Sequence, residues 1–301
     1  MVWLRIGDYQ VEQELGGDRA ARVFRGVHTL LPRHALIRVA READDNVAVL
    51  REACILAALP HPGIVRVFET GRIESRTWFA QEIIEGLTLD AMFHALPGDD
   101  GIEPATAVGM LRDVAEILAY AHHRGVIHCA ILPHKLVLAR GRGFALCITD
   151  WAAARAHDAS TPYSGDLGPF TAPEVHADAG IDDRADVFAL GVVAYRTLTG
   201  RMPAVQPVPS EVHCPEVPRE LTSLVDQMLS HDRWDRPSAA EARAELAWLA
   251  TALAKQSGPV EVVRVRKPRW TPQIDLGTKL RSATESGEGI LPGGSPARWR
   301  T

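Results

Sequence analysis

The chain has 301 residues, of which 46% are apolar and 24% charged, and this composition fits one two-lobed domain or two ordinary ones. The formal net charge of −5 provides no overall field to attract nucleic acid. No apolar run reaches the ~18 residues of a membrane span, and the first eight residues lack the apolar h-region of a signal peptide, so we expect neither feature. The cysteines are widely spaced, so we expect reduced thiols in a cytoplasmic protein.

The first eighty or so residues predict a small, mostly antiparallel sheet with one helix. Polar and apolar residues alternate in short runs separated by turn residues, which is typical of half-buried strands. Asn46 can cap a helix whose apolar face is completed before Pro60. The expected strands are 7–16, 23–27, 35–39, 64–68 and 77–83, and the expected helical face is Val49, Ala53, Leu56 and Leu59.

The remainder of the chain predicts helices. Residues 107–123 form a long amphipathic pattern that Gly125 can stop. Asp182 or Asp183 can start a nearly all-apolar helix over 187–198, which should be the buried axis of this half. Two further helices are expected at 221–229 and 239–253. The predicted class is therefore α+β, with a β-rich half and a larger helical half.

Residues 126–138 read Val-Ile-His-Cys-Ala-Ile-Leu-Pro-His-Lys-Leu-Val-Leu. This segment resembles the catalytic loop of eukaryotic-type protein kinases, V-I-H-R-D-L-x-P-x-N-x-L-x, and the resemblance is closest to bacterial serine/threonine kinases. It extends over about residues 6–255 and implies a bilobal fold. We expect an N-lobe over 1–84, a helical C-lobe over 85–255, and a basic Pro/Gly-rich tail over 256–301, extended or disordered.

Several positions match landmarks that support the kinase scaffold. Glu52 matches the helical Glu that forms an ion pair with the nucleotide-site cation, and Glu174 matches the Glu of the A-P-E motif. The resemblance pairs Glu174 with Arg236 and assigns Asp186 to holding the catalytic-loop backbone. The hydrophobic spine would consist of His128, Trp151, Leu56 and Val67.

The positions that carry chemistry in the family are changed. Ala130 stands where the family has its catalytic Asp, and Lys135 where it has the metal-binding Asn. Arg38 replaces the nucleotide-site Lys, so no catalytic residue is assigned. Asp150 is retained as a metal ligand only if magnesium binds. We hypothesise that Lys135 forms a salt bridge with Asp150 in place of the ion; the alternative is that Lys135 points to solvent.

The nucleotide pocket implied by the resemblance is degraded. Asp18 replaces a phosphate-loop glycine and should repel phosphates, although Arg19 and Arg22 could offset its charge. Leu36 should partly fill the adenine slot. We expect no cofactor, or weak, metal-independent ATP binding. The vestigial pocket would comprise Gly16, Val23, Leu36, Arg38, Glu52, Gln81, Ile83, Val137 and Asp150, with Leu36 packed between Val23 and Val137.

Two segments are candidate partner surfaces. The tail 258–301 carries 8 Lys and Arg against 4 Asp and Glu, and it is either a solvated terminus or a docking arm. The segment 203–218 is too rich in proline for a helix and should form an exposed loop. Candidate phosphorylation sites lie at Ser160, Thr161, Tyr163 and Ser164.

Histidine and tryptophan residues have structural interpretations. The histidines near the catalytic-like loop lack the spacing of metal ligands, and we expect the tryptophans to pack rather than to form stacking platforms. These residues are His122, His123, His128 and His134, and Trp3, Trp234 and Trp248.

The leading prediction is a pseudokinase, a catalytically inactive scaffold or allosteric partner in a signalling complex. Its partner would be a protein: an active kinase, a phosphatase or a phosphopeptide-binding domain. The alternative is a residual kinase or a nucleotide transferase that uses Asp150, Glu52 and Arg38. A third possibility is a switch that binds nucleotide without turnover.

Overall fold

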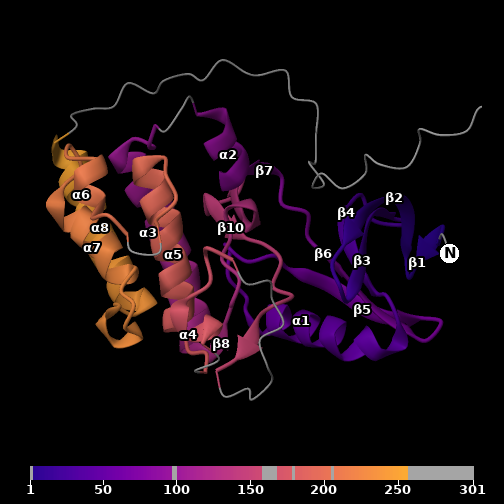
Figure 1. The fold of residues 1–301 in the computed structure, drawn as a ribbon. Coiled ribbons are helices and arrows are strands. Elements are labelled where there is room, and N and C mark those ends of the chain that lie inside the picture. The colour runs from indigo at the N-terminus through magenta and orange to yellow at the C-terminus, as the bar shows by residue number, and fades with distance from the viewer. Residues whose placement is uncertain (1–2, 97–99, 158–167, 178–179, 205–206, 257–301) are drawn as a thin grey trace, which may run out of the picture. The chain divides into compact units, whose positions relative to one another are not determined.

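A six-stranded antiparallel sheet with strand order β1-β2-β3-β4-β6-β5 forms the N-terminal part of the protein (Figure 1). The computed structural model describes residues 3–96, 100–157, 168–177, 180–204 and 207–256, all within one unit. The strands are β1 (Arg5–Ile6), β2 (Tyr9–Gly17), β3 (Ala21–His28), β4 (His34–Ala40), β5 (Val67–Ile73) and β6 (Arg76–Gln81). Strand β5 starts later than expected, because Ile64 makes only an isolated parallel bridge with Ile148.

Helix α1 (Asn46–Ala58) packs against this sheet and buries the predicted apolar face. The expected cap is wrong in detail, because the N-cap position belongs to Asp45. Asn46 instead uses its side chain to hold the β5–β6 hairpin: its Nδ2 donates to the Ser75 carbonyl and its Oδ1 accepts from the Thr77 N–H. The polar side chain at the start of the helix therefore makes a tertiary contact and not a local cap.

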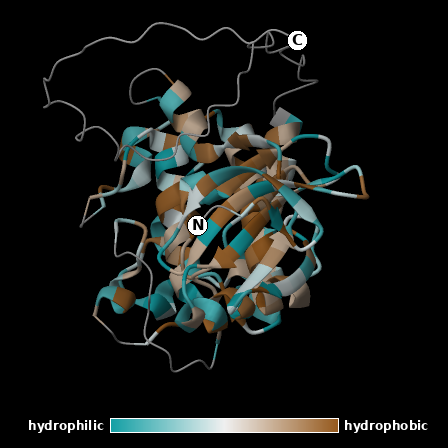
Figure 2. Cartoon of the chain, turned by 90° about the vertical axis from the view of Figure 1, so that its right-hand side faces the viewer, coloured by the Kyte–Doolittle hydropathy of each residue, from teal (hydrophilic) through white to brown (hydrophobic). Residues whose placement is uncertain are grey.

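The opposite face of the sheet carries a second hydrophobic core, and the alternating hydropathy of its strands is visible in Figure 2. Strand β1, which sequence reasoning missed, brings Trp3 onto this face with only 7% of its surface exposed. Trp78 is also buried there and lies against Gly71, where an added Cβ would approach its ring to 2.8 Å. These aromatic residues bury this face of the sheet, while α1 covers the other face, so both faces of the sheet are buried.

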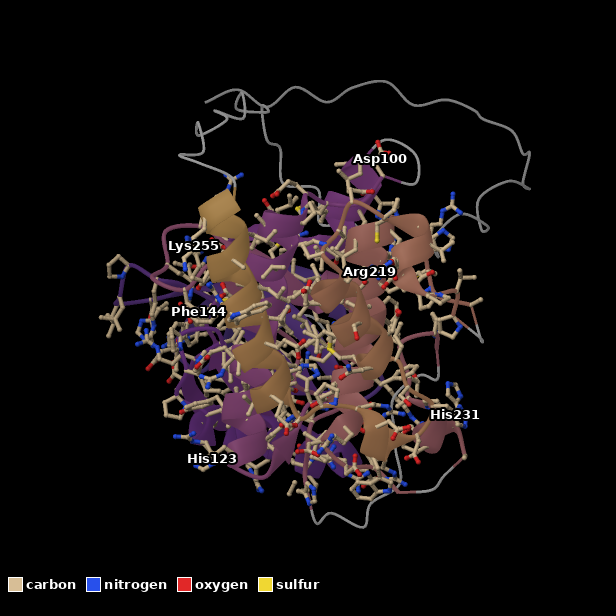
Figure 3. All side chains as sticks on the ribbon, turned by 90° about the vertical axis from the view of Figure 1, so that its left-hand side faces the viewer. Asp100, His123, Phe144, Arg219, His231 and Lys255 are labelled. Carbon is tan, nitrogen blue, oxygen red and sulfur yellow. The ribbon has the colours of Figure 1, made fainter. Side chains whose placement is uncertain are left out.

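The C-terminal part is mainly helical. Helix α5 is almost wholly buried, as expected for the axis of this part, and Gly200 ends it in the left-handed conformation with φ 71°. Figure 3 shows His123 and Lys255, the C-terminal ends of α3 and α8, at opposite ends of the helical layer, so these packed helices run antiparallel. The helices are α2 (Leu89–Ala95), α3 (Pro104–His123), α4 (Pro173–His176), α5 (Arg184–Thr199), α6 (Ser210–His213), α7 (Arg219–Met228) and α8 (Ala239–Gln256).

Short strands connect the helical part to the sheet region. A three-stranded sheet has the order β10-β9-β7, and a two-stranded sheet pairs β11 with β8. Their bounds are β7 (Gly86–Thr88), β8 (Val126–Ile127), β9 (Leu136–Ala139), β10 (Leu146–Ile148) and β11 (Arg155–Ala156). The α+β architecture is confirmed. The expectation that residues 203–218 contain no helix is wrong, because Pro209 precedes α6 as its N-cap rather than interrupting it.

Three single-turn 3₁₀ helices complete the described structure: η1 (Ala43–Asp45), η2 (Pro133–Lys135) and η3 (Arg233–Asp235). Within the described ranges, no helix combines the length and apolar character needed to cross a membrane. Apart from Gln256, which ends α8, the expected tail lies outside the described residues, as do the four candidate phosphorylation sites.

Candidate functional site

The backbone of the catalytic-like loop is held by a carboxylate in the first turn of α5. Asp186 Oδ2 accepts a 2.8 Å hydrogen bond from the His128 N–H, and its Oδ1 accepts one of the same length from Cys129. His122 Nε2 lies 2.8 Å from the same carboxylate. Burial raises the pKa of Asp186, but the hydrogen bond and charge of His122, together with the charge and backbone hydrogen bond of His128, keep this pKa below its usual value. The expected role of Asp186 in the loop frame is confirmed.

The predicted spine is assembled beside this loop. The rings of His128 and Trp151 meet edge to face with centroids 4.6 Å apart, and both side chains are fully buried. Leu56 is buried in the same core, and Val67 packs against it. Burial lowers the pKa of His128 to about 4, and the nearby Lys135 charge adds to this effect, so the imidazole is neutral at physiological pH.

A second expected support is a buried ion pair in the helical part. Arg236 donates to Glu174 through two nitrogens, at 2.7 and 2.8 Å, and both residues are buried. Burial raises the pKa of Glu174, but the hydrogen bonds and charge of Arg236, together with a backbone hydrogen bond and the charge of Arg233, lower this pKa overall. Glu174 is therefore held as a carboxylate in a geometrically satisfied pair.

The cleft contains the predicted lysine–aspartate bridge. Lys135 Nζ lies 3.0 Å from Asp150 Oδ2, and Lys135 is only 7% exposed. The hypothesis that Lys135 pairs with Asp150 is confirmed, and the alternative that it points to solvent is wrong. Burial raises the pKa of Asp150, yet Lys135 and then Arg38 outweigh it and hold this pKa below its usual value.

Arg38 forms the centre of a wider charge cluster. Its Nε lies 2.9 Å from Glu52 Oε2, so the expected ion pair is present, although this contact lacks hydrogen-bond geometry. Its Nη1 lies 3.9 Å from Asp150 Oδ1, and its Nη2 makes a close ion pair with Asp18. The cluster thus contains three carboxylates, from Asp18, Glu52 and Asp150, and two cations, from Arg38 and Lys135.

Asp18 occupies the phosphate loop in a way that sequence reasoning missed. Its Oδ1 accepts from the backbone N–H groups of Ala20 and Ala21, each at 2.8 Å, while its other oxygen contacts Arg38. Asp18 therefore occupies two N–H groups of the loop and also adds a negative charge beside Arg38. The Asp-x-Ala-Ala spacing was the available signal, because Asp side chains commonly bond to N–H groups two and three residues ahead. Arg22, which we expected to offset Asp18, pairs with Glu14 at 2.7 Å instead.

Leu36, the residue expected to fill the adenine slot, lies in the middle of the N-lobe sheet. It pairs with Gln81 across the β4–β6 ladder, is half-buried, and belongs to neither hydrophobic core. Val23 lies diagonally from Leu36 on the same face of the sheet, because it pairs with Arg38. The packing of Leu36 between Val23 and Val137 remains a prediction. Gln81 is buried, and its Oε1 has no hydrogen-bond partner among the described residues.

The donor set does not fit a magnesium ion. Asp150 is the family's metal ligand retained here, and an ammonium group lies 3.0 Å from it. An ammonium has no lone pair to ligate a cation and repels it. Within the described ranges, no group of three or more His, Cys, Asp or Glu side chains could hold a metal ion. We therefore derive no step that depends on a metal at this site.

The remaining aromatic predictions had mixed outcomes. Trp3 packs in the core as expected, but the packing expected for two other tryptophans is wrong. Trp234 in η3 is 74% exposed, and none of the three residues of η3 is buried. Trp248 is 58% exposed because it lies on the solvent side of α8, whose other face buries Leu246 and Leu249.

The site lies in a protein kinase domain, since the protein kinase domain family matches residues 9–248. The chain therefore belongs to the protein kinase family. It is similar to the serine/threonine-protein kinase PknJ of Mycobacterium tuberculosis, with 34% identity over 206 residues that cover 65% of this chain and 34% of PknJ. It is also similar to the serine/threonine-protein kinase pkn2 of Myxococcus xanthus, with 28% identity covering 96% of this chain and 38% of pkn2. The chain thus spans little more than a third of the length of these curated relatives.

Solved structures agree on the fold. The crystal structure of the Mycobacterium tuberculosis PknI kinase domain matches with a TM-score of 0.65 and 23% identity, covering 81% of this chain and 97% of that domain. The protein kinase fold, with an antiparallel N-lobe sheet and a helical C-lobe, is confirmed, as is the expected resemblance to bacterial serine/threonine kinases.

Proposed function

We propose that this kinase domain is a pseudokinase, which acts as a scaffold or allosteric partner in a signalling complex and not as a phosphotransferase. The observation that carries the proposal is the 3.0 Å contact between Lys135 Nζ and Asp150, which places a cation of the protein where the family needs a metal ligand. Ala130 adds to it, because a methyl group cannot accept the proton of a substrate hydroxyl.

The size of the expected loss supports this assignment. Removing a general base costs ~10²–10⁴ in rate, and the metal site is compromised as well. In contrast, the supports of the scaffold are intact: Asp186 holds the loop, and Glu174 pairs with Arg236. A chain that retains the frame and lacks the reacting groups is suited to binding partners through its surface.

The proposed nucleotide behaviour is weak or absent ATP binding that does not depend on a metal ion. The proposed partner is a protein, for example an active kinase, a phosphatase or a phosphopeptide-binding domain. The segment 203–218 supports this choice, because Val208 and Val212 are 43% and 65% exposed there. A pull-down with and without residues 258–301 would test the contribution of the tail.

A transfer assay tests the function directly. The full chain is incubated with ATP labelled at the γ or the α phosphate, Mg²⁺ or Mn²⁺, and a generic protein substrate, beside an active bacterial serine/threonine kinase. We expect no transfer of either label above background. Labelled protein from γ-labelled ATP would show a residual kinase, and labelled protein from α-labelled ATP would show a nucleotide transferase; either result would overturn the proposal.

A further inference from the structure

The carboxylate of Asp18 sits where several donors converge. Two successive backbone N–H groups, those of Ala20 and Ala21, point to Asp18 Oδ1 at 2.8 Å each. Successive main-chain N–H groups that converge in this way form a cradle for an anion. The cradle is therefore filled by a side chain of the same loop.

The second oxygen of Asp18 faces a cation from the interior of the cleft. Arg38 forms a close ion pair with it, and the Arg38 side chain is only 8% exposed. An ordinary turn formed by an Asp side chain needs only the local N–H groups. The addition of a buried guanidinium twenty residues away, through its Nη2, gives the carboxylate the kinds of donor that a phosphate group would use: main-chain amides and an arginine N–H group.

The cluster around Asp18 carries a surplus of negative charge. Arg38 and Lys135 face the carboxylates of Asp18, Glu52 and Asp150, so the formal sum is −1 when all are ionised. A phosphate-type anion entering this cluster meets a like charge that is already hydrogen-bonded. Without Asp18, the same groups would sum to zero, and three donors would lose their acceptor.

We propose that Asp18 is an internal substitute for a bound phosphate: it closes a latent oxyanion site made of the Ala20 and Ala21 N–H groups and the Arg38 guanidinium. The proposal does not depend on the absence of catalysis, because it concerns which anion occupies the loop. Its consequence is that the loop and Arg38 adopt their ligand-paired arrangement with no ligand, and that an external oxyanion binds only by displacing Asp18.

The test measures binding of inorganic pyrophosphate to the full-length chain by titration calorimetry, in EDTA and at near-physiological salt. We expect Asp18→Gly to bind pyrophosphate at least about tenfold more tightly than the wild type, since a like charge is removed and donors are released. Asp18→Asn keeps an acceptor for the loop amides but removes the charge, so it should fold like the wild type and show a smaller gain in the same direction.

Two controls separate the site from general charge effects. Asp8→Asn makes the same charge change at an exposed aspartate that pairs with Arg5 at 2.8 Å, and it should bind pyrophosphate like the wild type. Adding Arg38→Gln to Asp18→Gly should remove the gain, because the buried cation is lost.

If both Asp18 variants bind pyrophosphate with the affinity of the wild type, Asp18 only forms a turn, and the proposal is overturned. An equal gain in Asp8→Asn would overturn it as well, since the effect would then be one of overall charge. If Asp18→Gly does not fold, the gain in Asp18→Asn decides the question alone.

Discussion

Glu52 and Arg38 lie 2.9 Å apart inside a cluster that has one carboxylate more than it has cations. The pKa of Glu52 is raised to about 7, chiefly by burial; Arg38 opposes this increase, and the charges of Asp150 and Asp18 add to it. The pKa of Glu174 is lowered instead, because Arg236 donates two hydrogen bonds to this carboxylate. The other hydrogen bonds from Arg236 go to the main-chain carbonyls of Arg184, Ser230 and His231. The two glutamate–arginine pairs that the family resemblance predicts therefore differ. Glu174 has two hydrogen bonds from Arg236, whereas Glu52 shares Arg38 with the carboxylates of Asp18 and Asp150.

The pH dependence of stability should reveal this shared cation. An unfolded glutamate ionises near pH 4.5, whereas the pKa of buried Glu52 is about 7. Between these values the native state retains a proton that the unfolded state has lost, so raising the pH lowers the free energy of unfolding. Relative to the wild type, Glu52→Gln should gain about 1 to 3 kcal/mol as the pH rises from about 5 to about 7, measured by urea unfolding.

His128 titrates with the opposite sign over much of this range, since its pKa is lowered to about 4. It is present in both proteins, so the difference between them isolates Glu52. Glu220→Gln, at an exposed position on α7, serves as the control and should parallel the wild type. Parallel curves for Glu52→Gln as well would contradict the raised pKa.

Breaking the Glu174–Arg236 pair should destabilise the helical lobe strongly. Arg236→Leu leaves the buried Glu174 carboxylate without its partner, and such losses cost about 3 to 5 kcal/mol. Arg243→Leu is the matched control, because Arg243 also contacts a glutamate, Glu116, at 2.9 Å but at the surface. The control should lose about 1 kcal/mol or less by chemical denaturation. Equal losses in the free energy of unfolding would show that the buried pair stabilises the protein no more than the surface pair.

Removing the internal ammonium should create a metal response. Lys135→Asn frees Asp150 and supplies an amide oxygen, which is a ligand type that Mg²⁺ accepts. We expect millimolar Mg-ATP to raise the melting temperature of this variant by a few degrees and to leave the wild type unchanged. Lys255→Asn, at the exposed end of α8, removes the same charge and should match the wild type. A melting shift in the wild type that appears with Mg-ATP and is abolished by EDTA would show that Lys135 does not exclude the ion.

The second core of the N-lobe can be probed at its edge. Trp3→Ala removes an aromatic side chain that is 7% exposed and packs edge to face on Phe24 with ring centroids 5.8 Å apart. We expect a loss of about 3 to 5 kcal/mol in the free energy of unfolding. Trp234→Ala makes the same change at a residue that is 74% exposed and should cost about 0.5 kcal/mol or less. Comparable losses at the two positions would mean that β1 is not part of the folded core.

The order of helices and strands was predictable because the apolar period changes from two to about 3.6 near Pro104, about a third of the way along the chain. The Lys135–Asp150 bridge was predictable because the resemblance fixed where both backbone positions lie. The contact of Arg38 with Asp18 was not, since it depends on how the loop folds over the strand. Strand β1 has only two residues, which is too short for any periodic signal, and the sides taken by Trp234 and Trp248 depend on tertiary packing.

The hydrogen bonds from His128 and Cys129 to Asp186 use main-chain N–H groups, so they do not depend on the side chains of the loop. Substitutions of neighbouring side chains can therefore leave the fold of the domain intact. The same independence makes this loop a practical place to exchange side chains one at a time.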